Sequence, residues 1–151
     1  MFGLYFGKRF ESLLEIKAHQ EKAHLIRIPD GCRVIGRGRN PKTIRVKSPF
    51  DFVLAHDLGT VFFDAKSYDK KTFSFSEVNR NQVKKLLQLE EKRNISGYLI
   101  FFREIDSIRF IPASDLNNLM PRSSLCAASY PDLGNEQTFT FFNLLENLKL
   151  S

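Results

Sequence analysis

The sequence has few cysteines and no long apolar run. Only two of its 151 residues are cysteines, Cys32 and Cys126, and their separation does not match a metal-binding pattern. We expect free thiols in a reducing compartment, with a disulfide as the alternative. No apolar run approaches the roughly 18–20 residues of a membrane span, and segment 1–7 has neither the length nor the cleavage site of a signal peptide. These absences predict a cytoplasmic protein with no membrane partner.

Internal repeats, low-complexity segments and linkers are also missing. The chain is 42% hydrophobic and 13% aromatic, and its length is sufficient to bury a core. We therefore expect residues 1–151 to form a single domain, with its core at about 8–119. The C-terminal extension, 120–151, carries apolar residues at helical spacing, so it should pack on the domain or on a second subunit.

Positive charge dominates one part of the chain. The net charge is +6, from 23 basic and 17 acidic residues, which favours a polyanionic partner. Between Arg27 and Lys47 the only acid is Asp30, among seven basic residues. We predict that segment 30–47, which is rich in glycine and arginine, is a loop or poorly ordered hairpin that contacts phosphates. A solvated basic loop with no ligand is the alternative.

Two neighbouring segments, 49–55 and 60–66, have the composition of β-strands. Both are rich in β-branched and aromatic residues, and residues 56–59 between them have turn chemistry. This pattern predicts an antiparallel hairpin. If the connection closes with Ala55 opposite Thr60, residue numbers at paired positions sum to 115.

This register makes a strong prediction about three charged residues. It places Asp51 directly opposite Asp64, where Cβ atoms lie roughly 4.5–5.5 Å apart and two carboxylates repel each other. Lys66 follows on the same strand face, about 6–7 Å further along. A bound divalent cation would remove the repulsion between the acids. The alternative is a degenerate, metal-free fold in which Asp64 and Lys66 are an exposed cross-strand pair.

The remaining periodicities predict an α/β (α+β) fold with a central mixed sheet flanked by helices. Glu11 and Gln82 lie on two of the predicted helices, and surface solvation is the alternative for each. Besides the hairpin, the expected elements are helices at about 8–24, 76–94, 115–120 and 136–149, and strands at 25–29, 98–102 and 107–111.

The residues in this order resemble the PD-(D/E)XK nuclease superfamily. Glu11 on a helix, then Asp51, then Asp64-Ala65-Lys66 is similar to its pattern of a helical glutamate, an aspartate and an acid-x-Lys element. Within the superfamily the chain looks most like Holliday-junction resolvases of the RecU type and the archaeal type. The similarity covers roughly 8–119. It implies a restriction-endonuclease-like fold and a role in DNA recombination and repair in a bacterium or phage.

The resemblance also implies a role for each site residue. Asp51 and Asp64 would bind Mg²⁺ or Mn²⁺, with the Ala65 carbonyl as a third ligand. Glu11 would either ligate the metal or orient the site through water. Lys66 would position or help deprotonate the attacking water and stabilise charge on the scissile phosphate. Gln82 would hold Lys66 or the water.

Partners follow from the same resemblance. We expect a homodimer that cuts four-way DNA junctions, because symmetric cuts need two active sites. A nuclease acting on other DNA structures, and a DNA-binding module with no catalytic activity, are the alternatives. DNA contacts are expected from the basic residues Lys8, Arg9, Arg33, Arg37, Arg39, Lys42, Arg45, Lys47, Lys70 and Lys71.

Overall fold

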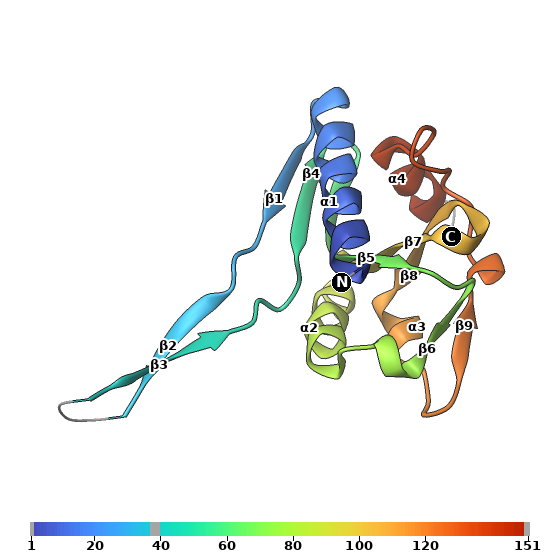
Figure 1. Ribbon diagram of the computed structural model, residues 1–151. Helices are drawn as coiled ribbons and strands as arrows, with labels where there is room; N and C mark the ends of the chain where they lie inside the picture. The colour runs from blue at the N-terminus through green and yellow to red at the C-terminus, as the bar shows by residue number, and fades with distance from the viewer. Residues whose placement is uncertain (1, 37–39, 150–151) are drawn as a thin grey trace.

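A five-stranded mixed sheet forms the centre of the molecule (Figure 1). The computed structural model describes residues 2–36 and 40–149. The strands lie in the order β1-β4-β5-β7-β8, and all neighbours are antiparallel except β5 and β7. Their bounds are β1 His24–Arg27, β4 Phe52–His56, β5 Gly59–Tyr68, β7 Ile95–Phe102 and β8 Ser107–Pro112.

Helices cover both faces of this sheet. The helices are α1 (Phe2–Gln20), α2 (Arg80–Glu91), α3 (Ala113–Asn117) and α4 (Phe141–Lys149). The helices α1 and α4 share one buried cluster with one sheet face, whereas α2 and α3 share a second cluster with the other. The predicted central mixed sheet flanked by helices is therefore confirmed.

Strand alternation on β5 decides which residues face which helices. Val61 and Phe63 are fully buried in the cluster beneath α1 and α4. Successive side chains of a strand point to opposite faces, so Phe62, Asp64 and Lys66 face the α2 side. Phe62 does pack against the second cluster. The acids and α1 therefore belong to opposite layers.

A two-stranded arm projects from the body (Figure 1). Its strands are β2 (Gly31–Ile35) and β3 (Lys42–Val46), paired antiparallel from Gly31↔Val46 to Ile35↔Lys42. Segment 30–47 is thus a regular hairpin over its described residues, where a loop or poorly ordered hairpin was predicted. The β-branched residues of Thr43–Val46 favour an extended strand. The prediction missed this because it gave more weight to the glycines.

All four predicted helices have different bounds in the structure. The third covers Ala113–Asn117, where 115–120 was predicted, and the fourth begins at Phe141, where 136 was predicted. The first helix begins at Phe2 and ends at Gln20, because Lys22 adopts a left-handed backbone (φ 56°) and the chain then enters β1. The second begins at Arg80, and its N-cap is Asn79, whose side chain accepts the Asn81 and Gln82 N–H groups. Ser76, where this helix was predicted to begin, lies in a short 3₁₀ turn, Phe75–Glu77.

The C-terminal segment contacts the body through a second small sheet and a helix. Strand β6 (Thr72–Ser74) pairs with β9 (Ser124–Cys126), and 3₁₀ turns occupy Arg103–Ile105 and Ala127–Ser129. Three residues of α4, Phe141, Leu144 and Leu145, are buried in the core cluster with α1. The expectation that residues 1–151 form a single domain stays a prediction. Within the described residues, no helix has the length and apolarity to cross a membrane.

Candidate metal and nuclease site

The β4–β5 register brings the two acids together. Ala55 pairs with Thr60 and Phe52 with Phe63, so the predicted register is confirmed. Asp51, one residue before β4, therefore lies beside Asp64. Its Oδ2 atom accepts a hydrogen bond from the Ala65 N–H at 3.4 Å. Asp51 and Asp64 share one face of the sheet, as the sequence predicted.

Asp64 is a buried carboxylate with a partner on each oxygen. It is only 2% exposed. The Lys66 Nζ lies 3.0 Å from its Oδ2, and the Gln82 Nε2 donates to its Oδ1 at 3.2 Å. A buried charge is tolerated when it is paired and hydrogen-bonded. The structure thus brings four of the predicted site residues, Asp51, Asp64, Lys66 and Gln82, into one cluster.

Tyr98 completes this cluster, and the sequence analysis missed it. It is fully buried on β7 opposite Asp64. Its hydroxyl donates to the Gln82 Oε1 at 3.3 Å and accepts from the Asn79 N–H at 3.3 Å. The Lys66 Nζ lies 4.8 Å from the centre of its ring. Tyr98 therefore fixes the Gln82 amide so that the NH₂ group faces Asp64.

One sequence signal could have identified Tyr98. It begins an otherwise apolar run, 98–102, whose composition is typical of a strand that is buried on both faces. A tyrosine hydroxyl in such a strand needs a hydrogen-bond partner. The partner could not be named from sequence, because the parallel β5–β7 pairing joins segments more than thirty residues apart.

Burial and mutual repulsion perturb the ionisation of this cluster. Burial, together with the neighbouring Asp64, raises the pKa of Asp51 to about 7. Burial lowers the pKa of Lys66, but the charges of Asp64, Tyr98 and Asp51 and the hydrogen bond to Asp64 together outweigh it, so the pKa is raised. Lys66 therefore carries its positive charge at neutral pH, whereas Asp51 is poised between its charged and neutral forms.

Glu11 is held elsewhere. Its carboxylate forms an ion pair with Arg27 at 2.6 Å, and α1 covers the sheet face opposite to Asp64. Among residues 2–36 and 40–149, no group of three or more His, Cys, Asp or Glu side chains is placed to hold a metal ion. The structure thus does not group Glu11 with Asp51 and Asp64, and its role as a ligand stays a prediction.

The predicted DNA-contacting residues fall in three places. Arg33, Lys42, Arg45 and Lys47 belong to the arm or its root, whereas Arg37 and Arg39 lie outside the described residues. Lys70 and Lys71 lie in the turn between β5 and β6. Lys8 and Arg9 lie on α1, away from the acids, and Arg9 pairs with Glu136 at 3.0 Å. Of these basic residues, Arg45 and Lys47 line a groove together with Gln82, which contacts Asp64.

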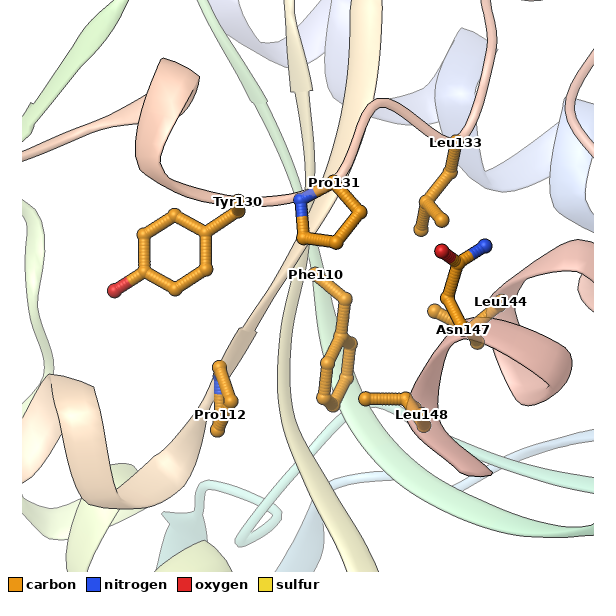
Figure 2. A pocket seen from close by; sticks show the side chains of 8 residues that line it. All are labelled: Phe110, Pro112, Tyr130, Pro131, Leu133, Leu144, Asn147 and Leu148. Atoms are coloured by element: carbon orange, nitrogen blue, oxygen red, sulfur yellow. The ribbon is translucent and has the colours of Figure 1, made fainter. Parts of the chain in front are cut away.

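A separate apolar cavity lies between β8 and α4. Figure 2 shows side chains from β8, the segment 130–133 and α4 turned toward it. Its volume is about 190 Å³, and no charged residue lines it. Because none of the clustered residues reaches this cavity, it is not part of the candidate site.

Comparison with known proteins identifies the family of the chain. The family model of Recombination protein U, RecU, matches residues 36–129. The chain belongs to the RecU family. A curated relative, the Holliday junction resolvase RecU of Mycoplasmopsis pulmonis (strain UAB CTIP), is 26% identical over 80 residues. This match covers 53% of the chain and 51% of the relative, so the chain spans about half the relative's length.

A solved structure supports the fold. The resolvase Hjc of Archaeoglobus fulgidus, described as a Holliday junction resolvase from an archaeal hyperthermophile, matches with a TM-score of 0.55 at 19% identity. The match covers 87% of this chain and 97% of Hjc. The predicted restriction-endonuclease-like fold is confirmed by this likeness.

The raised pKa of Asp51 predicts how stability varies with pH. Unfolded aspartate titrates near 3.9, but folded Asp51 titrates at about 7. Between these values the folded state keeps a proton that the unfolded state releases, so the free energy of unfolding falls as the pH rises from about 4 to about 7. Asp51→Asn should remove this part of the slope, measured by urea unfolding of metal-free protein.

The matched control is Asp57→Asn, which changes an exposed aspartate in the β4–β5 turn. The free energy of unfolding of this variant should depend on pH as it does in the wild-type protein. An identical slope in wild type and Asp51→Asn would contradict the assignment of the raised pKa to Asp51.

Proposed function

We propose that this chain is a divalent-metal-dependent endonuclease that hydrolyses phosphodiesters in four-way DNA junctions. The observation that carries the proposal is the juxtaposition of Asp51 and Asp64 with the Lys66 Nζ, 3.0 Å from Asp64. Family membership supports the substrate, since the curated relative and Hjc are both named Holliday junction resolvases. The same activity would place the protein in recombination and repair in the cytoplasm.

The donor set fits Mg²⁺, with Mn²⁺ as a substitute. Mg²⁺ takes one or two carboxylates and keeps several waters, and Asp51 and Asp64 supply two hard oxygen donors on one face. The Ala65 carbonyl is the further ligand that we propose, since Glu11 is paired with Arg27 at 2.6 Å on the layer opposite to Asp64. When bound, the ion would neutralise charge on the phosphate and lower the pKa of a coordinated water.

The surrounding residues then have separate tasks. Lys66 stays protonated and would stabilise negative charge that develops on the scissile phosphate. Its raised pKa favours this task over abstraction of a proton from water. Gln82 holds Asp64 in place through the 3.2 Å hydrogen bond, and Tyr98 holds Gln82. Lys66 and the two acids would orient the attacking water for in-line displacement.

A homodimer is part of the proposal. A four-way junction has two strands to cut symmetrically, and each chain supplies one site. Two chains related by a two-fold axis would place one site on each strand.

The function is tested on synthetic DNA. In Mg²⁺ the wild-type protein should cut a four-way junction and leave a linear duplex of matched sequence largely uncut. Asp64→Asn should reduce the cleavage rate by more than about a hundredfold, because it removes a metal ligand and a charge next to Lys66. Gel analysis of labelled strands measures the rate, and junction binding without metal checks that the variant folds.

Each other outcome supports a different function. Equal cutting of junction and duplex would remove the resolvase assignment and leave a nuclease for other DNA. Binding with no cleavage by the wild-type protein in any divalent metal would leave a DNA-binding module without catalytic activity.

Tyr98 gives a second test, because it acts through Gln82. Tyr98→Phe keeps the ring beside Lys66 but removes the hydroxyl that orders Gln82. We expect kcat to fall by about ten- to a hundredfold, as for other partners of metal ligands, with KM nearly unchanged. The control is Tyr68→Phe, a partly buried tyrosine of the same core cluster. A similar loss in both variants would show that Tyr98 serves only packing.

A further inference from the structure

A groove of about 830 Å³ lies between the root of the arm and the start of α2. From the arm side it is lined by residues 45–49, which include Arg45 and Lys47. From α2 and its cap it is lined by Asn79, Asn81, Gln82 and Lys85. Every charged residue among these is basic. The groove therefore suits a polyanion.

The arm wall of this groove is fixed by Asp30. One carboxylate oxygen of Asp30 accepts the Ser48 N–H at 2.8 Å, and the other pairs with the Arg45 Nε at 3.2 Å. The hydrogen bond from Ser48 keeps the pKa of Asp30 below its ordinary value. Since Asp30 neutralises part of the Arg45 charge, the groove depends on other cations for its attraction to phosphate.

Lys85 is the cation on the opposite wall. Each residue advances a helix by about 100°, so Lys85 falls between Asn81 and Gln82 on the helix surface. Its side chain is exposed, and it makes no ion pair or hydrogen bond within the part of the chain that the structure describes. Lys84 is exposed too, but it lies about 100° from Lys85 and away from Gln82, and it does not line the groove.

Gln82 joins the groove to the acidic cluster. It lines the groove and also donates to Asp64 at 3.2 Å. A strand whose scissile phosphate lies at Asp51 and Asp64 can therefore continue directly into the groove.

We propose that this groove holds the backbone of the strand being cut, and that Lys85 contacts a phosphate next to the scissile one. The inference rests on the proposed nuclease function and deepens it, since Lys85, Asn79 and Asn81 were not among the predicted DNA contacts. Asn81 is adjacent to the same path and can donate its amide to a phosphate or sugar oxygen. The charge of the lining favours nucleic acid over an acidic protein partner, because phosphates recur at every step of the backbone.

The first experiment compares Lys85→Ala with Lys84→Ala. Binding of a labelled four-way junction is measured in EDTA, where metal-dependent cleavage cannot occur. Lys85→Ala should weaken binding about three- to tenfold and reduce the slope of log affinity against log salt by about 0.9, since one phosphate contact is lost. Lys84→Ala removes the same charge from the same helix and should leave the slope unchanged.

The second experiment locates the phosphate. Neutral methylphosphonate linkages are placed one at a time along the cut strand, and wild-type and Lys85→Ala proteins are titrated with each junction. At one linkage adjacent to the scissile phosphate, the neutral substitution should weaken binding by the wild-type protein. The same substitution should not weaken binding by Lys85→Ala relative to its binding of the unmodified junction. This non-additive result identifies the partner of Lys85.

The outcomes separate this inference from the proposed function. Equal effects of Lys84→Ala and Lys85→Ala, or additive effects at every linkage, would contradict the proposed role of the groove. The proposed cleavage of junctions would not be affected by either result. Conversely, if the wild-type protein never cuts DNA but shows the linkage-specific effect, the groove binds a DNA backbone and the proposed nuclease function is contradicted. No binding of DNA by the wild-type protein would overturn both.

Discussion

The pairing of β4 with β5 is the constraint on which the site depends. A slip of one residue in this register would move Asp64 and Lys66 to the face covered by α1. The core prevents such a slip, because the stacked rings of Phe52 and Phe63, 5.5 Å apart, are fully buried beneath α1 and α4. Packing on the face beneath α1 and α4 therefore fixes the positions of the charged side chains on the opposite face. The two carboxylates are held together despite their repulsion because the apolar face does not permit another register.

The charges are supported by a buried polar network. Asp64 has Lys66 on one oxygen and Gln82 on the other, while Tyr98 links Gln82 to the Asn79 N–H at the start of α2. A buried network is stable when every member has a partner. Because the network spans β5, β7 and α2, it orders the site before any ligand arrives. Electrostatic stabilisation of a developing charge is most effective when the groups are preorganised in this way.

The sequence predicted the local parts of this arrangement and not its long-range parts. The β4–β5 hairpin could be read because its turn is short and its strands are rich in β-branched residues, which fixed Asp51 opposite Asp64. Tyr98 was missed because its place beside Asp64 follows from a parallel pairing across a helix. The arm was predicted as a loop or poorly ordered hairpin because the prediction gave more weight to its glycines than to its β-branched residues. For Glu11, a helical position could be predicted, but its pairing with Arg27 depends on how α1 packs on the sheet.

The central claim is that Asp51 and Asp64 together hold a divalent cation, and titration with Mn²⁺ followed by electron paramagnetic resonance tests it most directly. The free-ion signal should fall as Mn²⁺ binds the wild-type protein near pH 8, above the pKa of about 7 of Asp51. The double variant Asp51→Asn, Asp64→Asn should leave the ion free, and Asp57→Asn should bind as the wild type does. Equal binding by the wild-type protein and the double variant, or no binding by either, would contradict the account.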